Sequence, residues 1–490
     1  MGKYILSVDQ STQGTKALLF DDKGSLLCRT DKPHRQIIND KGWVEHDLNE
    51  IYANTLQVVK DLVSKAGIDK GEIVALGISN QRETSACWSK KTGEPLYNAI
   101  VWQCSRGAAI CEGLEKQGYS ETVYRKTGIK LSPYFPAAKL AWIFQNVAGV
   151  SERSKAGEIA AGTIDSWLVW KLTNGERHQT DYSNASRTQL FNINSLEWDE
   201  DLLKIFGLDK RCMAEVTDSD GDFGMTDFDG WLDRKIPICG VLGDSHGALF
   251  GQGCLDTGMI KATYGTGSSI MMNTGDKPVF SDAGIVTSLA WKIGGKVNYV
   301  LEGNINYTGA VITWLKDDLK LIASPGETES LARAAKRNDK TYLVPAFSGL
   351  GAPYWDSHAS ACIVGMTRST GKNEIVKAAL DCIVYQITDI VEAMRSSSGI
   401  TISGLRVDGG PTRNKYLMQF QSDMLNIPVR VPDAEELSGI GAAYCAGISA
   451  GLYGDDVFKN LKRTLYVPDM AGSERKNLYD GWKNAVTKSR

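Results

Sequence analysis

The sequence predicts an α/β protein built from two lobes. Apolar runs of strand length alternate with stretches of helical periodicity along the chain, which is the pattern of α/β folds. A turn rich in glycine, threonine and serine lies between two strand-like runs near the start, and again just past the middle. At 490 residues the chain is long enough for two or more domains. We expect one domain over residues 1–247 and a second over 248–490, each led by a hairpin.

The first half opens with three predicted antiparallel strands, at residues 4–9, 16–20 and 25–29. A helix is expected over residues 48–65, because apolar side chains recur there at helical spacing. Residues 73–78 (IVALGI) predict a buried strand, and the polar cluster SNQRET follows at once. Ligands of open α/β sheets gather where strands end. We therefore expect a binding site at this cluster.

The second half repeats the scheme. Residues 236–242 (IPICGVL) predict a strand that ends in Gly243-Asp244, and a connecting helix is expected from residue 247. The second hairpin follows, with strands at residues 259–262 and 270–272. A strand at 405–408 runs into two glycines, and helices are expected over residues 414–425 and 440–451.

Composition limits the class of partner. Lysine plus arginine total 55 and acids total 58, a net charge of −3, so neither nucleic acid nor an anionic membrane is expected. No apolar run reaches 18 residues, and the ten cysteines are scattered without a CxxC pair. We expect a cytoplasmic protein with reduced thiols and a small-molecule substrate. A homo-oligomer is possible, and the sequence does not fix its state.

The two polar turns are candidate phosphate clamps. They read DQSTQGTK at residues 9–16 and YGTGS at residues 264–268. Glycine lets backbone N–H groups converge on an anion, and hydroxyls add donors. Each turn alone could equally be an ordinary polar hairpin. The first turn also carries Asp9 and Lys16, a pairing that suits a nucleotide with its metal ion.

Three acids, Asp9, Asp244 and Asp408, directly follow apolar strands. A single such acid is usually a turn former or a helix cap. Phosphoryl transfer requires positioned phosphates, a divalent cation and a carboxylate that accepts the acceptor's proton. We assign Asp9 to a divalent metal site, through water, and Asp244 to the general base.

Arg82 and Glu83 could hold successive hydroxyls of a small polyol, since one donates and the other accepts hydrogen bonds. The alternative is a solvated surface pair. Trp102 could wall the carbon chain of the polyol, or could simply pack in the core.

Several blocks of the chain are characteristic. They are GWVEHD (42–47), GISNQRET (77–84), YNAIVWQC (97–104), TDYSNASRT (180–188), YGTG (264–267), VPAFSGLGAPYWD (344–356) and RVDGG (406–410). With these blocks, and with two signature segments at residues 134–146 and 361–381, the chain resembles the FGGY carbohydrate kinases over nearly its whole length. Within that family it is most similar to the glycerol kinase group.

The resemblance implies an actin-like, ribonuclease-H-like fold of two lobes with a catalytic cleft between them. It also implies ATP-dependent phosphorylation of a terminal hydroxyl of a small polyol, with Mg²⁺. By resemblance the nucleotide is held by Thr12, Gln13, Gly14, Lys16, Thr266, Gly309, Thr313, Gly410 and Asn414. The polyol is held by Arg82, Glu83, Tyr134 and Asp244, and Asp244 matches the general base. Lys16 replaces the usual arginine and loses its bidentate fork.

Two departures fall in the acceptor pocket. Ser245 stands where this group has glutamine, and Ser269 stands where it has phenylalanine. Both changes enlarge the pocket, so a longer C4–C5 polyol or ketose is an alternative acceptor. His246 stands beside the proposed base, and the sequence does not settle whether it contacts substrate. A non-catalytic, actin-like nucleotide sensor is the alternative of another class, although Asp9, Asp244 and both turns are intact.

Overall fold

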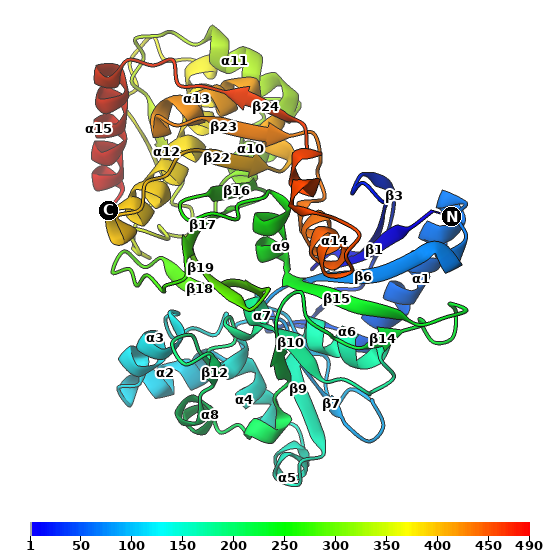
Figure 1. Cartoon of the computed structure of the whole chain (residues 1–490). Coiled ribbons are helices and arrows are strands. Elements are labelled where there is room, and N and C mark those ends of the chain that lie inside the picture. The colour runs from blue at the N-terminus through cyan, green and yellow to red at the C-terminus, as the bar shows by residue number, and fades with distance from the viewer. Residues whose placement is uncertain (1) are drawn as a thin grey trace.

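The computed structural model describes residues 2–490. Two large sheets lie in separate parts of the molecule, with helices α9 (Asp244–Gly251) and α14 (Leu437–Ser449) between them (Figure 1). Within the described residues, no helix is both long and apolar enough to cross a membrane.

The first sheet carries the first hairpin. Its strands, in spatial order, are β14 (Met225–Thr226), β15 (Ile236–Gly243), β6 (Ile73–Asn80), β1 (Tyr4–Gln10), β2 (Gly14–Phe20) and β3 (Leu26–Pro33). As predicted, β1, β2 and β3 are antiparallel neighbours, and β6 and β15 are buried strands, here parallel to β1. The polar ends of β1, β6 and β15 therefore meet at one edge of the sheet.

Helices cover both faces of this sheet. Helix α1 (Leu48–Ala66) packs on one face together with α6 (Ile164–Leu172). Asp47 caps the start of α1 by accepting from two backbone N–H groups, and Gly67 ends it in the left-handed conformation. Helix α14 packs on the other face, so closely that a Cβ at Gly77 would lie 2.3 Å from the carbonyl oxygen of Ala442. A helix from the second half of the chain thus completes the first sheet.

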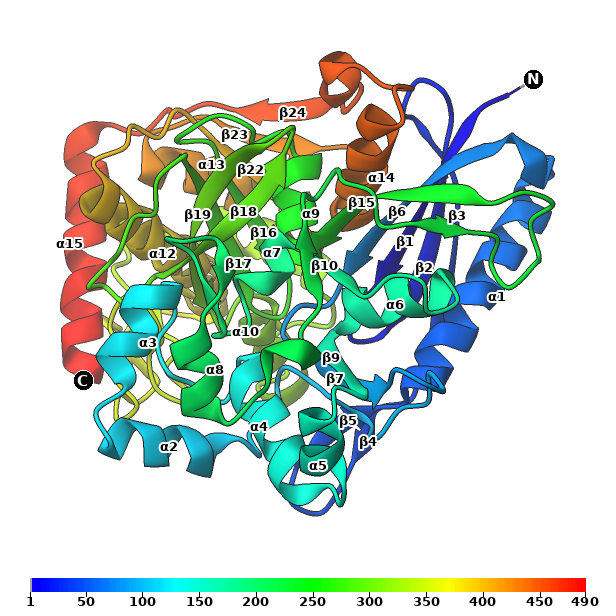
Figure 2. The ribbon, with the colours of Figure 1, turned by 60° about the horizontal axis from the view of Figure 1, so that its bottom comes forward.

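The second sheet carries the second hairpin. Its strands are β18 (Val286–Ile293), β19 (Lys296–Ile305), β17 (Ser268–Gly275), β16 (Ile260–Tyr264), β22 (Leu405–Asp408), β23 (Val429–Pro432) and β24 (Arg463–Tyr466). It shares the largest apolar core with α10 (Gly309–Thr313), α11 (Thr328–Ala334), α12 (Lys372–Ser398), α13 (Lys415–Leu425) and α15 (Gly472–Ser489). Helix α15 runs along the side of this lobe away from the first sheet (Figures 1 and 2). Strands β20 (Tyr342–Val344) and β21 (Cys362–Val364) form a separate pair.

A third layer comes mostly from the chain between β6 and β15, with two strands from before β6, and we did not predict it. Its sheet contains β4 (Ile37–Ile38), β5 (Val44–His46), β8 (Ala99–Ile100), β7 (Ser85–Ser89) and β9 (Ile159–Thr163). Its helices are α2 (Ala108–Lys116), α3 (Ser120–Thr127), α4 (Pro136–Asn146), α5 (Val150–Lys155) and α8 (Glu200–Phe206). Short elements link it to the two large sheets: β10 (Gln179–Asp181), β13 (Glu215–Thr217) and α7 (Tyr182–Ala185) reach the first sheet or pair with a strand that does, and α7 with β11 (Phe191–Asn192) and β12 (Glu197–Trp198) packs toward the second. Strands β4, β5 and β8 have only two or three residues, which carry too little period to be recognised in sequence.

The helix expected from residue 247 begins three residues earlier. Gly243 is the extended N-cap residue, and Asp244 is the first residue of α9. A carboxylate is favoured at that position because it faces the positive end of the helix dipole. The start of the helix therefore places Asp244 at the end of β15.

Candidate active site

The first hairpin places Asp9 opposite Lys16. The two residues are backbone partners across β1 and β2, and the Lys16 ammonium lies 4.0 Å from an Asp9 carboxylate oxygen. Asp9 is buried, and its Oδ1 atom has no hydrogen-bond partner. Burial, with a smaller contribution from the Asp244 charge, raises the pKa of Asp9 to about 6 against the opposing effect of Lys16. An unpartnered buried carboxylate oxygen is a suitable ligand for a hard divalent cation.

The second hairpin holds the start of α10. The N–H groups of Thr308 and Gly309 donate to the carbonyls of Thr266 and Gly265, at 3.0 and 2.9 Å. A Cβ at Gly309 would lie 2.8 Å from the Gly265 carbonyl oxygen, so only glycine fits this approach. The turn and the helix therefore form one rigid wall.

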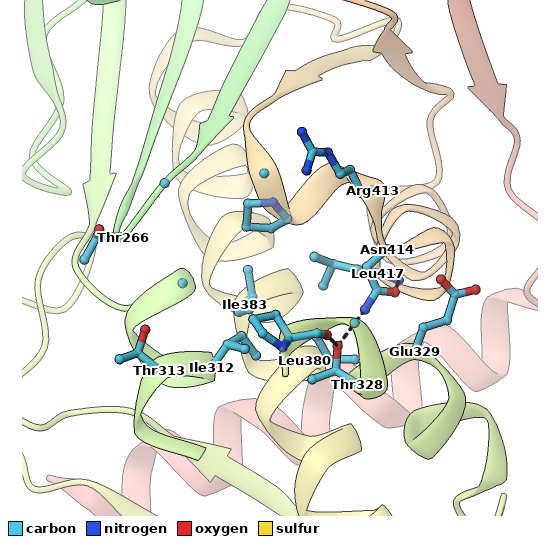
Figure 3. Close-up of a pocket in the computed structure, with 16 residues that line it drawn as sticks. Thr266, Ile312, Thr313, Thr328, Glu329, Leu380, Ile383, Arg413, Asn414 and Leu417 are labelled. Atoms are coloured by element: carbon cyan, nitrogen blue, oxygen red, sulfur yellow. Dashed lines mark hydrogen bonds between the residues drawn. The ribbon is translucent and has the colours of Figure 1, made fainter. Parts of the chain in front are cut away.

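A cavity of about 570 Å³ opens beside that wall (Figure 3). Five of the predicted nucleotide residues line it: Thr266, Gly309, Thr313, Gly410 and Asn414. Apolar side chains, among them Ile312, Leu380, Ile383 and Leu417, complete the lining. An apolar cavity with a polar rim suits a flat aromatic base joined to a polar chain.

Sequence reasoning missed part of this cavity. Thr328, Glu329 and Arg413 also line it, and they carry no motif. Asn414 donates to the Thr328 hydroxyl at 3.1 Å and accepts from the Leu417 N–H at 3.0 Å, so it joins α11 to the start of α13. The sequence analysis counted Asn414 as the first residue of this helix, and the structure shows it as the N-cap.

The predicted nucleotide residues of the first hairpin lie outside this cavity. Thr12, Gln13, Gly14 and Lys16 belong to the β1–β2 turn and strand β2. A Cβ at Gly14 would lie 2.5 Å from the Lys32 carbonyl oxygen, which accounts for the glycine. The structure therefore brings the predicted nucleotide residues together in two groups, one on the first hairpin and one around the cavity beside the second hairpin.

Arg82 and Glu83 are buried, so the alternative of a solvated surface pair is wrong. The Arg82 guanidinium binds both oxygens of Glu302 at 2.9 Å, and its Nε lies 3.2 Å from Asp244 Oδ1. Glu83 accepts from Arg187 Nε at 2.6 Å, and Arg187 in turn lies 3.0 Å from Glu302. The two residues that we expected to grip a polyol are thus fixed in a network of four buried charges.

Arg187 and Glu302 were not among the predicted site residues. They come from the segment after α7 and from β19, so no local pattern joins them to residues 82 and 83. Burial alone would raise the pKa of Glu302, but Arg187 and Arg82 hold it well below its usual range. Glu302 therefore stays ionised and orients the Arg82 fork.

Asp244 is the exposed carboxylate of this group. Its side chain is 37% exposed, whereas those of Arg82 and Glu302 are buried. The Ser245 N–H donates to its Oδ1 at 2.6 Å. The carboxylate can therefore be approached from the solvent side while a buried cation holds it.

The sequence differs from the glycerol kinase pattern at Ser245 and Ser269, and His246 follows Ser245. These three residues lie around the Arg82 network. Ser269 donates to Glu302 Oε1 at 3.2 Å, and Ser245 is half-buried. His246 is fully buried, with Nδ1 3.5 Å from Arg82 and Nε2 3.4 Å from the Ser288 hydroxyl. Burial and the Arg82 charge hold the pKa of His246 well below its usual value. His246 is thus a neutral neighbour of Arg82.

Two aromatic side chains connect this group to the first hairpin. The Trp102 and Tyr134 rings lie 5.5 Å apart, and Trp102 Nε1 donates to the Thr12 hydroxyl at 2.9 Å. Trp102 is half-buried and also packs against an apolar core cluster, so core packing accounts for part of its position. The buried Lys139 donates to the Pro133 carbonyl at 2.8 Å and to that of Tyr134, which fixes the segment that presents the Tyr134 ring.

Asp408, the third strand-end acid, is already satisfied by the protein. Gln252 donates to it at 3.2 Å. Burial raises the pKa of Asp408, and the nearby Lys261 charge opposes the rise. Asp9 and Asp244 therefore remain the two strand-end acids with the features that a metal ligand and a base require.

The structure has two lobes, each with a glycine-bearing hairpin, and the Asp244 carboxylate is held at the end of a strand. These features define a nucleotide-dependent phosphotransferase of the actin-like class. Residues 4–251 match the N-terminal domain of the FGGY family of carbohydrate kinases, and residues 260–450 match its C-terminal domain. The chain belongs to this family. It is therefore an ATP-dependent carbohydrate or polyol kinase, and the predicted family and fold class are confirmed.

Similar proteins align along the full chain. Glycerol kinase 1 of Thermotoga maritima is 50% identical over 488 residues, 99% of each chain. The glycerol kinase of Bacillus licheniformis is 45% identical and covers 100% of this chain and 99% of its own. A crystal structure of Plasmodium falciparum glycerol kinase with ADP has a TM-score of 0.94 at 35% identity, covering 100% of this chain and 98% of that one. The xylulose kinase of Lactobacillus acidophilus shares the fold, with a TM-score of 0.88 at 23% identity over 99% of each chain.

Proposed function

We propose that the chain transfers the γ-phosphoryl group of ATP to a terminal hydroxyl of glycerol or of a closely similar small polyol. The observation that carries the proposal is the Arg82–Asp244 pair at 3.2 Å. A buried guanidinium that also binds Glu302 forms an ion pair with one oxygen of a carboxylate whose side chain is otherwise open to the cleft. The similarity to glycerol kinases at 45–50% identity supports the choice of acceptor.

In this proposal the cavity beside the second hairpin takes the adenine nucleoside. The apolar lining from α10, α12 and α13 receives the base, and Asn414 and the Thr266 turn face its polar parts. The first hairpin, with Thr12 and Lys16, then faces the phosphates. Binding on both hairpins places the γ-phosphate between the lobes, where orientation supplies much of the rate.

Asp244 accepts the proton of the acceptor hydroxyl. The hydroxyl oxygen forms the new bond to the γ-phosphorus while the bond to the β-phosphate oxygen breaks, and ADP leaves. Arg82, Glu83, Trp102 and Tyr134 hold the acceptor beside the base. Buried ion pairs keep the first two in place before substrate arrives.

Asp9 would hold Mg²⁺, since its unpartnered buried oxygen fits the ligand preference of that ion. When bound, Mg²⁺ neutralises charge on the transferred phosphates. We also infer a reducing, cytoplasmic compartment, because all ten cysteines are free thiols.

A longer acceptor is the second candidate. Ser269 and Ser245 are small side chains, and the Ser269 hydroxyl lies at the Glu302 end of the network. Compared with phenylalanine and glutamine they leave room and hydroxyls for an extra acceptor carbon. A C4 or C5 polyol or ketose could occupy that room.

A coupled assay that follows ADP formation across C3 to C5 polyols and ketoses tests both candidates. We expect turnover with glycerol and no turnover without an acceptor. Absence of ATP-dependent phosphorylation of every polyol and ketose would overturn the proposed function. A higher kcat/KM for a C4 or C5 acceptor would select the second candidate.

A further inference from the structure

The ammonium of Lys16 is held by a residue from the other half of the chain. Lys16 Nζ donates to Glu436 Oε2 at 2.6 Å, whereas the nearest Asp9 oxygen is 4.0 Å away. The other oxygen of Glu436 pairs with Arg29 on β3. Glu436 therefore joins two cations, and it leaves Lys16 with further N–H donors that are not committed to the protein.

The position of Glu436 is fixed by the packing of α14. Glu436 is the N-cap residue of that helix and its side chain is 10% exposed. Three residues on, Gly439 lies against the first hairpin, since a Cβ there would be 2.7 Å from a Leu18 methyl carbon and 3.6 Å from Asp9 Cβ. The Ser7 hydroxyl donates to the Gly439 carbonyl at 2.9 Å. The carboxylate thus has a defined place beside Lys16.

We propose that Glu436 is a positioning residue that holds the Lys16 ammonium toward the nucleotide phosphates and away from the Asp9 carboxylate. This inference rests on the proposed function, in which Lys16 faces phosphate and Asp9 the metal ion. Glu436 touches neither ligand and acts through Lys16.

Lysine needs such a partner more than arginine does. Its ammonium is a point charge on a flexible four-carbon stem, without the planar fork that would itself fix a direction. Without Glu436, the nearest carboxylate to Lys16 is Asp9. An Asp9–Lys16 pair would draw the cation away from the phosphates and place a positive charge on the carboxylate that a metal ion needs.

The test measures MgADP affinity by titration calorimetry in wild type, Glu436→Gln, Lys16→Met and the double variant. We expect Glu436→Gln to weaken MgADP binding about fivefold, the scale of one ion pair. Because Glu436 acts through Lys16, the same change should have no effect in the Lys16→Met background.

Asp31→Asn is the matched control. Asp31 is the backbone partner of Lys16 on β3, yet its carboxylate pairs with Arg29 at 3.7 Å and not with Lys16. We expect this variant to bind MgADP like wild type. The inference is overturned if Glu436→Gln binds MgADP as wild type does, or if its effect persists in the Lys16→Met background. If wild type has no kinase activity but the effect of Glu436→Gln on MgADP binding still depends on Lys16, the proposed function is wrong and the role of Glu436 stands.

Discussion

At the scale of single residues, Asp244 carries the proposed proton transfer. The carboxylate is held at one oxygen by Arg82 Nε and by its neighbouring backbone N–H, and its side chain is 37% exposed. Replacement by asparagine keeps the shape and removes the base. General-base catalysis contributes about 10²- to 10⁴-fold. We expect Asp244→Asn to lose at least about 100-fold in kcat while ADP affinity stays within about threefold of wild type. A variant that keeps more than a tenth of wild-type kcat would refute the role.

Asp9 predicts a specific pH dependence of stability. Burial raises its pKa from 3.8 to about 6, so between these values the folded state binds more protons than the unfolded state. The contribution of Asp9 to stability is therefore lost as pH rises from about 4 to about 6, by roughly 3 kcal/mol at full shift.

The measurement is urea unfolding of wild type and Asp9→Asn from pH 4 to pH 7.5. Asparagine does not titrate. The free energy of unfolding of the variant minus that of wild type should therefore increase as the pH rises to about 6, and should stay constant above that pH. A difference that does not vary with pH would exclude the raised pKa.

Ser245 and Ser269 predict a change of acceptor. Glutamine at 245 and phenylalanine at 269 would narrow the pocket around the Arg82 network. We expect the double variant Ser245→Gln, Ser269→Phe to shift the ratio of kcat/KM toward glycerol, against C4 and C5 acceptors, by about 1–3 kcal/mol. On the second candidate function, wild type accepts glycerol and has a higher kcat/KM with a longer acceptor. If wild type already prefers glycerol to all longer acceptors, the two serines do not enlarge the substrate range.

At the scale of elements, the contact between α9 and α14 positions the base. A Cβ at Gly441 would lie 1.9 Å from the Gly247 carbonyl oxygen, and one at Gly251 would lie 2.5 Å from that of Leu437. Gly441→Ala should therefore destabilise the protein by about 1–3 kcal/mol through overpacking. Because α9 begins at Asp244, kcat should fall as well.

Gly113→Ala is the control for this prediction. Gly113 lies inside helix α2, and no atom lies within 4 Å of a Cβ built there. The alanine should stabilise the protein by about 0.5–1 kcal/mol, the helical preference for alanine over glycine. Urea unfolding of both variants checks the pair. If Gly441→Ala stabilised the protein as much as Gly113→Ala does, the α9–α14 contact would have to shift to accommodate the added methyl group.

The sequence predicted the features that depend on neighbouring residues, and it did not predict those that depend on residues far apart in the chain. The strand at 73–78, the helix at 48–65 and both hairpins were predicted because apolar period and turn residues are local. The Arg82 network was not, because Glu302 reaches Arg82 from 220 residues away. The placement of α14 on the first sheet likewise depends on glycines whose role is visible only when Gly77 and Ala442 meet.

At the scale of the whole molecule, the predicted nucleotide residues lie in two groups, one on the first hairpin and one around the cavity beside the second. Thr266, Gly309, Thr313, Gly410 and Asn414 line one cavity, while Thr12 and Lys16 lie on the first sheet. One nucleotide must span both groups for transfer to occur. Motion of the lobes toward each other would bring the groups together and exclude water from the γ-phosphate.

We therefore expect the lobes to close when both substrates bind. Small-angle scattering with a non-hydrolysable ATP analogue, Mg²⁺ and glycerol should give a smaller radius of gyration than the ligand-free protein. The analogue alone should give a smaller change, because the acceptor residues Arg82, Trp102 and Tyr134 would still lack their ligand. An unchanged scattering profile, with binding of both ligands confirmed by calorimetry, would mean that the two hairpins reach the phosphates without domain motion.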